Sequence, residues 1–145
     1  MTVKISVDHK SQQILLDIGK HGFKHRRALR IALNEIGSHV ANKMANYIFR
    51  PPKTGRWYNY NGRRYQASAP GESPANRTGK LAGSGGYRVN GYYDVTIYEK
   101  AEYSAFLEYG TRKMAARPHL SRAVTATRRD AVKIIQDQIN KELKR

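Results

Sequence analysis

The chain has 145 residues, with 27 Lys and Arg against 11 Asp and Glu, which gives a formal net charge of +16. This length predicts one domain, which can also carry an extended arm. The chain contains no cysteine, which excludes disulfide scaffolds and thiolate metal sites. No signal-peptide stretch follows Met1 and no run of about 18 apolar residues occurs, so we expect a chain made in the cytoplasm without a membrane span.

The positive charge is spread along the whole chain. Residues 1–50 carry nine basic and three acidic side chains, residues 51–85 carry six and one, and residues 86–145 carry twelve and seven. Such a chain attracts polyanions, so its candidate partners are nucleic acid, an acidic protein and a membrane surface. Because charge alone carries no base-sequence information, it does not indicate specific recognition of nucleic acid.

The N-terminal segment predicts two short elements. Val3, Ile5 and Val7 alternate with polar residues, which is typical of a strand with one buried face, over residues 2–8. The apolar run Ile14–Ile18 precedes a turn rich in glycine and predicts a short helix or turn.

A long helix is predicted over residues 24–49. Apolar residues recur there at steps of three and four, which places them on one stripe of a helix. The stripe consists of Leu29, Leu33, Ile36, Val40, Met44 and Ile48. Pro51 and Pro52 follow it and end the helix.

Residues 50–86 differ in character from the rest of the chain. They contain four prolines, seven glycines and almost no aliphatic residues, which predicts an extended functional arm or loop. Within this arm, Asn61-Gly62 lies between alternating aromatic and polar residues and predicts a β-hairpin, because both turn positions need a positive φ. An isolated hairpin is only marginally stable, so this one needs support from its own domain or from a neighbouring subunit.

The C-terminal half predicts a second hairpin around Asn90-Gly91, a short helix over residues 102–109 and a last helix that opens at Pro118. The apolar stripe of this last helix consists of Leu120, Val124, Ala131, Ile134, Ile135, Ile139 and Leu143. The order of elements predicts an α+β fold. We expect a small antiparallel sheet packed by the long helix and the C-terminal helix, with residues 1–145 in a single domain that has an extended arm at about 50–86.

No pattern of residues indicates catalysis or cofactor binding. Gly83–Gly86 is followed by a strand and not by the helix that a phosphate loop needs. His21 and His25 lack a third ligand, and His119 has no partner at a motif spacing. The acidic residues Glu99, Glu102 and Glu108 cluster in sequence, but ion pairs to arginines explain them more simply than acid–base catalysis. We therefore expect a chain that is not an enzyme and holds no metal or cofactor.

Aromatic and basic residues alternate through the first hairpin. They are Arg56, Trp57, Tyr58, Tyr60, Arg63, Arg64 and Tyr65. This pattern suits a nucleic-acid surface, which combines base stacking with phosphate contacts. It also suits a protein interface, where aromatic residues and arginine are enriched too, and of the two we favour packing against a neighbouring subunit.

Two stretches, within residues 52–81 and 101–120, carry a resemblance to a known family. The first ends in Thr78-Gly79-Lys80-Leu81, and the second contains the patterns Tyr-x-x-x-x-Glu-x-Gly-Thr and Ala-Arg-Pro-x-Leu. In this order and spacing they resemble the neck, or tail-completion, proteins of long-tailed bacteriophages, which are also described as head–tail connectors or minor tail components of siphophages. The matched positions are Thr78, Gly79, Leu81, Tyr103, Glu108, Gly110, Thr111, Arg117 and Pro118. At the position of His119 the family often has Phe.

The resemblance implies a structural virion protein without catalytic residues. It implies a ring, with six copies as the expected number, at the head–tail junction through which DNA passes. The implied partners are further copies of the chain, the neighbouring head-closure or connector proteins, and the tail-terminator or tail-tube proteins. Non-specific contact with transiting DNA fits the charge. The alternative is a basic nucleic-acid-binding protein without catalytic activity.

The matched residues have predictable structural roles. Gly110 can end the short helix in a left-handed conformation, and Thr111 can satisfy the backbone groups freed beyond it. Arg117 and Pro118 set the entry to the last helix, and we predict an ion pair between Arg117 and Glu108.

The remaining matched residues lie at the end of the arm. Thr78-Gly79 predicts a turn that directs Leu81 into the core. We predict that residues 50–77 form the assembly interface, because this segment is the least able to bury itself. A ring of chains with net +16 also needs compensating charge, which we expect mainly from acidic partner rings.

Overall fold

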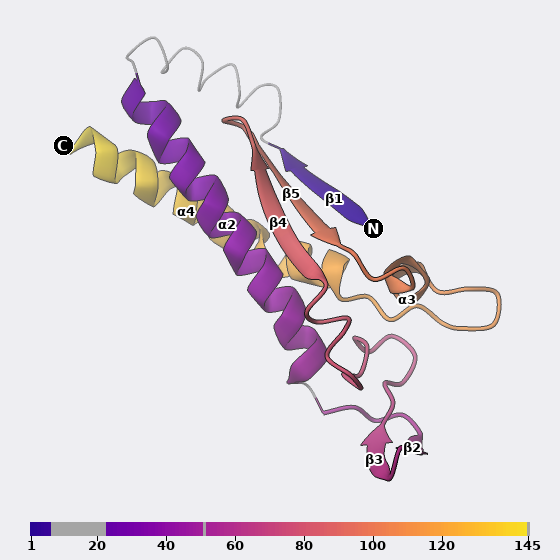
Figure 1. Ribbon diagram of the computed structural model, residues 1–145. Coiled ribbons are helices and arrows are strands. Elements are labelled where there is room, and N and C mark those ends of the chain that lie inside the picture. Colours follow the sequence, from indigo (N-terminus) through magenta and orange to yellow (C-terminus); the bar gives the residue numbers. More distant parts are fainter. Residues whose placement is uncertain (7–22, 51, 145) are drawn as a thin grey trace. The chain divides into compact units, whose positions relative to one another are not determined.

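The structure, a computed structural model, describes residues 1–6, 23–50 and 52–144 and has an α+β fold (Figure 1). In chain order the elements are β1 (Thr2–Ser6), α2 (Phe23–Phe49), β2 (Trp57–Tyr60), β3 (Arg63–Gln66), β4 (Gly85–Asn90), β5 (Asp94–Glu99), α3 (Ser104–Tyr109) and α4 (Leu120–Leu143). The predicted small antiparallel sheet, long helix and C-terminal helix are all confirmed. Val7 and the element predicted at Ile14–Ile18 lie outside the described residues.

The chain divides into two compact units, each built from segments far apart in sequence. Unit 1 comprises Met1, Ala41–Gly85 and Glu99–Ala126, and unit 2 comprises Thr2–Val40, Gly86–Tyr98 and Thr127–Arg145. The helices α2 and α4 each contribute one part to either unit. That the chain acts as one domain stays a prediction.

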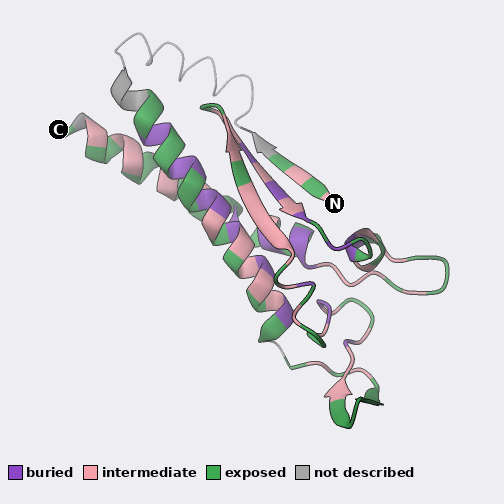
Figure 2. Cartoon of the chain, viewed as in Figure 1, coloured by how far each residue is buried: buried purple, intermediate pink, exposed green. Residues whose placement is uncertain are grey.

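Unit 2 contains most of a three-stranded sheet in the order β1-β5-β4. The antiparallel pair of β1 and β5 runs from Thr2 opposite Tyr98 to Ser6 opposite Asp94. In the central strand β5, Val95 and Ile97 are fully buried and alternate with half-buried neighbours, as the period of two in a strand requires (Figure 2).

The helix α2 packs on this sheet through a glycine. A Cβ atom placed on Gly37 would lie 2.9 Å from Cγ2 of Val95 and would also overlap the ring of Tyr87. The whole predicted stripe of α2 is buried, and no member is more than 3% exposed (Figure 2). The stripe of α4 is buried at Leu120, whereas its members from Ala131 to Ile139 are half-buried, as for a helix that keeps one side open to solvent.

The second hairpin is confirmed, with a longer turn than the Asn90-Gly91 pair predicts. Its strands β4 and β5 end and begin at Asn90 and Asp94, so three residues form the turn. Only Gly91 among them has a positive φ, of 65°. The side chain of Asn90 donates a hydrogen bond to Oγ1 of Thr96 at 2.5 Å and ties the end of β4 to β5.

Unit 1 has a small apolar core of its own. Ile48 of α2, Leu81 and Ala101 are buried together, with Ala82 and Leu107 packed against them. The short helix predicted over residues 102–109 is confirmed as α3. This core holds the segments that carry the hairpin β2–β3 and the family-like residues.

Candidate assembly interface

The hairpin β2–β3 in unit 1 forms with the turn that the sequence predicts. Trp57 pairs with Gln66 and Tyr60 with Arg63, and Asn61 and Gly62 have φ values of 48° and 74°. Both turn residues are therefore left-handed, as an Asn-Gly hairpin turn requires. Cross-strand partners share a face of a hairpin, so one face carries Tyr58, Tyr60, Arg63 and Tyr65 and the other carries Trp57, Asn59, Arg64 and Gln66.

The hairpin exposes large aromatic side chains. Trp57 is 53% exposed, and Tyr58 and Tyr60 are each 46% exposed. The exposed arginines of the segment, Arg56, Arg63 and Arg64, lie among them. An aromatic and basic surface of this kind is typical of a contact with another molecule.

Within the hairpin, the rings are ordered by contacts to each other and to arginines. The rings of Tyr58 and Tyr65 stack with centroids 5.6 Å apart. The Arg64 guanidinium lies 5.1 Å from the centroid of the Trp57 ring, and that of Arg77 lies 4.4 Å from the Tyr60 ring. These cation–π contacts hold the exposed rings in defined positions. The desolvation cost is small, because the arginines remain in water.

Glu72 fixes the base of the hairpin. Its carboxylate accepts hydrogen bonds from Oγ1 and N of Thr54, at 2.5 and 3.1 Å, and from the backbone N–H of Ala69, at 2.8 Å. The hydrogen bond from the Thr54 hydroxyl, followed by those from the two backbone groups, lowers the pKa of Glu72. The only carboxylate of residues 51–85 is thereby committed to the local structure.

Only the hairpin part of the predicted arm is extended. The segment after the hairpin packs against other parts of unit 1. Ser68 and Ser73 are buried, and Oγ of Ser73 donates to the carbonyl oxygen of Pro118 at 2.9 Å. The backbone N–H of Gly71 donates to the carbonyl of Ala116 at 3.0 Å. Beyond the hairpin, the expectation that residues 50–77 are the segment least able to bury itself is therefore wrong, because polar and backbone hydrogen bonds hold this part against its own unit. That residues 50–77 form the assembly interface stays a prediction.

The turn at Thr78-Gly79 directs Leu81 into the core, as predicted. Gly79 has a φ of 76°, and its N–H donates to Oδ1 of Asn76 at 2.8 Å. Leu81 is only 6% exposed and packs with Ile48. This part of the motif therefore maintains the fold of unit 1.

The residues after α3 behave in part as predicted. Gly110 ends α3 with a positive φ of 77°, but its ψ of −179° is extended, so the predicted left-handed helical cap does not form. A Cβ atom on Gly110 would lie 2.7 Å from the carbonyl oxygen of Met114. Oγ1 of Thr111 accepts a hydrogen bond from the N–H of Lys113 at 3.2 Å. Tyr103 precedes the first residue of α3 and is 39% exposed.

Glu108 caps the N-terminus of α4. Its carboxylate accepts hydrogen bonds from the backbone N–H groups of His119, Leu120 and Ser121 at 2.9, 3.1 and 2.8 Å. These are donors that a helix leaves unsatisfied in its first turn, and a negative charge is favourable there. Burial acts to raise the pKa of Glu108, but the hydrogen bonds from His119 and Ser121 outweigh it and hold the pKa well below its usual value.

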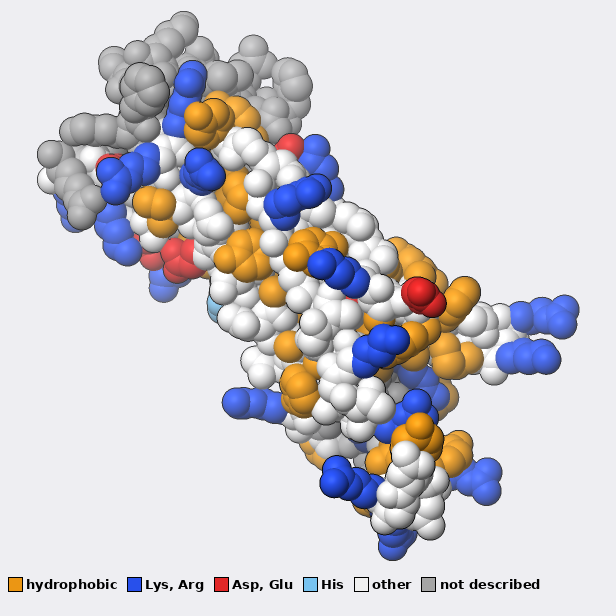
Figure 3. All heavy atoms as spheres, viewed as in Figure 1, with side chains coloured by type: hydrophobic (Ala, Val, Ile, Leu, Met, Phe, Trp, Pro, Cys, Tyr) orange, Lys and Arg blue, Asp and Glu red, His pale blue; other side chains and the backbone are white. Residues whose placement is uncertain are grey.

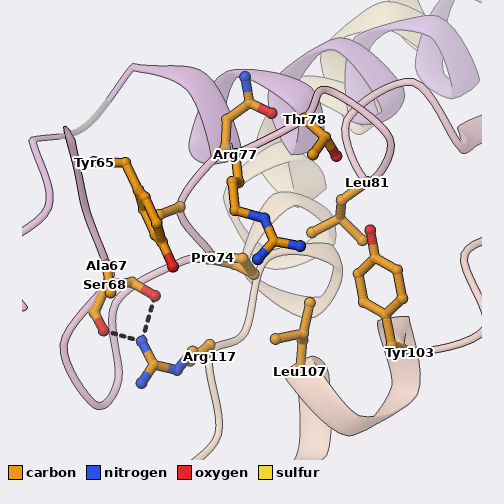
Figure 4. Close-up of a pocket in the computed structure, with 12 residues that line it drawn as sticks. Tyr65, Ala67, Ser68, Pro74, Arg77, Thr78, Leu81, Tyr103, Leu107 and Arg117 are labelled. Carbon is orange, nitrogen blue, oxygen red and sulfur yellow. Dashed lines mark hydrogen bonds between the residues drawn. The ribbon is translucent and has the colours of Figure 1, made fainter. Parts of the chain in front are cut away.

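The predicted ion pair between Arg117 and Glu108 is wrong. The Arg117 guanidinium donates to Ser68, to both the carbonyl oxygen and the hydroxyl (Figure 4). The backbone N–H of Arg117 donates to the carbonyl oxygen of Leu107 at 2.7 Å, and this hydrogen bond links Arg117 to α3. A carboxylate that already accepts three N–H bonds leaves little capacity for a guanidinium, and Arg117 instead holds the chain that follows the hairpin.

His119 is the central residue of a buried charged cluster that the sequence did not reveal. Its Nε2 lies 2.8 Å from Oε2 of Glu99, and its Nδ1 lies 3.1 Å from Oε2 of Glu108. The side chains of His119 and Glu99 have no exposed surface. Burial alone would lower the pKa of His119, but the hydrogen bonds and charges of Glu108 and Glu99 raise it to about 9.

Both ring nitrogens of His119 therefore face acceptors, which a protonated imidazole satisfies with two N–H donors. The expectation that arginines pair with Glu99 and Glu108 is wrong, because the cation in this core is a histidine. Within the described residues, no group of His, Asp and Glu side chains is arranged to hold a metal ion. None of the described helices is long and apolar enough to cross a membrane.

Next to the hairpin, unit 1 has an open cavity of about 260 Å³. Its apolar wall includes Leu81 and Leu107, and Tyr65 and Tyr103 line two of its sides (Figure 4). The guanidinium of Arg77 reaches into it between these rings (Figure 4). The cavity thus joins residues of the hairpin to matched residues of the family-like motif.

All of the sequence-predicted site residues lie in unit 1. The motif residues build the frame, and the aromatic and basic residues form the exposed hairpin that the frame supports. Comparisons with protein families, with curated proteins and with solved structures found no match to this chain.

Proposed function

We propose that this chain is a structural, non-enzymatic protein of the neck of a long-tailed bacteriophage, where copies form a ring at the head–tail junction. The observation that carries the proposal is the hairpin β2–β3, which exposes Trp57, Tyr58 and Tyr60 on a frame held by buried polar groups. Rigid, exposed aromatic residues are the usual anchors of protein interfaces. The resemblance of residues 52–81 and 101–120 to neck proteins supports this assignment.

The structural roles of the motif residues agree with a non-enzymatic function. Glu108 and Arg117 are engaged in holding backbone groups, at the start of α4 and at Ser68. His119 has no exposed surface, so a substrate cannot reach its ring. The buried groups of acid–base type described in unit 1, Glu99, Glu108 and His119, therefore support the fold, which favours assembly over catalysis.

The proposal is tested by locating the protein in virus particles. We expect mass spectrometry to detect the chain in particles produced from the genome that encodes it, and electron microscopy to place it as a ring between head and tail. Replacement of Trp57, Tyr58 and Tyr60 by Ser should leave a folded protein and yield heads and tails that do not join. The control is Tyr92→Ser, which removes a similarly exposed ring from unit 2. Particles that lack the chain, or turnover of a substrate by the purified protein, contradict the proposal.

A second candidate function is binding of nucleic acid without catalysis. The specific observation in its favour is the alternation of exposed aromatic rings and arginines in the hairpin, as at Trp57 and Arg64. This candidate predicts tight binding of free DNA or RNA by the hairpin at physiological salt, which the same Ser variant should abolish.

A further inference from the structure

The cations of unit 1 fall into two groups. Lys53, Arg117 and Arg122 are committed to the fold, because they donate to backbone oxygens or serine hydroxyls of their own unit. The arginines beside the hairpin face that carries Tyr60 differ. Arg77 contacts the Tyr60 ring, Arg63 is the cross-strand partner of Tyr60, and both arginines are exposed to solvent.

Unit 1 has few carboxylates to offer these arginines. It contains 13 Lys and Arg side chains against four Asp and Glu. Glu72 is held by Thr54 and Ala69, and Glu99 and Glu108 are held around His119, so Glu102 is the one exposed carboxylate of the four. Among the described residues no carboxylate pairs with Arg77, so this arginine is available to an acid from another molecule.

The cavity beside Arg77 adds an apolar requirement. Its volume of about 260 Å³ exceeds the roughly 150 Å³ that holds a benzene ring and falls below the roughly 300–1,000 Å³ of small-molecule sites. It is therefore of a size for one large side chain. Leu81, Leu107 and Pro74 line it, and these apolar side chains favour an aromatic or aliphatic group (Figure 4).

We propose that this cavity and the adjoining hairpin face bind an acidic segment of a different protein, with one aromatic or leucine side chain in the cavity and carboxylates on Arg77 and Arg63. The segment supplies the charge that unit 1 lacks. It also fills the apolar space that the arginines surround. This inference deepens the proposed function by naming the chemistry of the partner. It rests on the proposed function only in assigning the partner to the neck of the particle.

A second copy of the chain is a poor occupant of the cavity and of the hairpin face with Arg63, whereas the opposite hairpin face, with Trp57, stays available for contacts between copies. Unit 2 carries 14 Lys and Arg against seven Asp and Glu, so both units are strongly basic. Like charges brought together at an interface oppose binding. Nucleic acid is also disfavoured at the cavity, because a phosphate gains nothing from Leu81 and Leu107, and one face of the Tyr60 ring is already covered by Arg77.

The inference is tested with synthetic peptides and the full chain. One probe is a nine-residue peptide of Asp and Glu with a central Phe-Leu pair, and the second has Ser-Ser in place of Phe-Leu. We expect the peptide with Phe-Leu to bind at least about tenfold more tightly at 150 mM salt, and its NMR titration to shift the signals of Leu81 and Leu107. The two carboxylate-rich flanks are identical, so the difference measures the cavity alone.

Matched variants distinguish binding at the cavity from general electrostatic attraction of an acidic peptide to a basic protein. Arg77→Glu and Lys80→Glu change the net charge equally, and both side chains are exposed, but only Arg77 lines the cavity. We expect Arg77→Glu to lower the affinity for the Phe-Leu peptide at least about tenfold, and Lys80→Glu to lower it less than about threefold. Ala75→Leu, which adds atoms inside the cavity, should reduce the preference for Phe-Leu over Ser-Ser.

Four outcomes overturn the inference. The first three are equal binding of the two peptides, equal effects of the two charge variants, and displacement of the Phe-Leu peptide from the cavity by a single-stranded oligonucleotide at 150 mM salt. Absence of binding to either peptide at millimolar concentration also overturns it. If particles contain the chain as a neck ring but the peptides fail, only this inference falls. If the peptides bind at the cavity and particles lack the chain, only the neck assignment falls.

Discussion

At the scale of single residues, the histidine of unit 1 is buried in contact with two carboxylates. His119 is a buried cation between Glu99 and Glu108, and burial of charges is tolerated only when they are paired and hydrogen-bonded. Oε1 of Glu99 has no hydrogen-bond partner among the described residues, so Glu99 depends on the histidine for most of its compensation. The cluster joins the end of β5, the helix α3 and the start of α4.

His119→Phe should therefore destabilise the protein strongly. The substitution removes the cation and leaves Glu99 and Glu108 buried without it, which we expect to lower the free energy of unfolding by about 3–5 kcal/mol. Urea unfolding measures the change. The control is His39→Phe in unit 2, where the histidine is half exposed and pairs with Asp130, and it should change stability by less than about 1 kcal/mol.

A double substitution tests whether the lost charge pair is the cause. With Glu99→Leu added to His119→Phe, the uncompensated carboxylate is gone and an apolar pair takes its place, so part of the stability should return. If the double variant is less stable than His119→Phe alone, the loss comes from packing and not from the buried charge.

The raised pKa of His119 predicts a loss of stability at alkaline pH. In the unfolded chain the ring loses its proton near pH 6.5, whereas in the folded protein it keeps the proton to about pH 9. The folded state therefore binds more protons between these values, and stability falls as the pH rises from about 6.5 to 9, by about 3 kcal/mol at most. Urea unfolding at pH 6, 8 and 10 measures this fall, and His119→Phe should lack that part of it. A fall of equal size in both proteins contradicts the assignment.

At the scale of secondary-structure elements, the contact between α2 and the sheet of unit 2 depends on the absence of a side chain at Gly37. On an exposed helix, Gly→Ala stabilises by about 1 kcal/mol. At Gly37 the new Cβ atom meets Val95 at 2.9 Å and overlaps Tyr87, and overpacking of this kind costs about 1–3 kcal/mol.

We therefore expect Gly37→Ala to destabilise the protein by about 1–2 kcal/mol, opposite in sign to the helix propensity. Thermal unfolding followed by circular dichroism measures it. Asn46→Ala on an exposed position of α2 is the control, and it should be neutral or slightly stabilising. Stabilisation by Gly37→Ala would contradict this prediction, because it would mean that α2 and the sheet can move apart without loss of folding free energy.

The sequence predicted the elements whose signals are local. The stripe from Leu29 to Ile48 defined α2, and Asn61-Gly62 defined the first hairpin with both φ values positive. The folding of the segment after Gln66 was missed, because Ser68 and Ser73 are held by hydrogen bonds to backbone and side-chain groups some 50 positions away and leave no apolar pattern.

The candidate site was predictable in part, for a similar reason. The hairpin residues and the turns at Gly79 and Gly110 follow from local chemistry. The cluster of His119 with Glu99 and Glu108 joins three separate elements, and no spacing in the sequence connects them. Glu108 lies twelve residues before the first residue of α4, so it could have been recognised as a cap only with the path of the chain between them known.

At the scale of the whole molecule, the net charge of +16 would govern any contact of the protein with DNA. Lys and Arg side chains far outnumber Asp and Glu on the face drawn in Figure 3, and both units are basic. Such a surface attracts duplex DNA through its phosphates, without recognition of bases. In the proposed ring, this attraction would have to be weak enough for DNA to move through.

We therefore expect the purified protein to bind duplex DNA with an affinity that depends on salt and not on sequence. A contact that neutralises about four phosphates loses roughly 150-fold in affinity between 50 and 200 mM salt. Fluorescence anisotropy with two unrelated 20-base-pair duplexes at several salt concentrations measures both properties. Arg63→Glu and Lys133→Glu change the charge equally in units 1 and 2, so similar losses are expected if the attraction is diffuse. A preference for one duplex, or tight binding that persists at 200 mM salt and is abolished by Arg63→Glu alone, would favour a dedicated nucleic-acid-binding function for the hairpin over a neck ring.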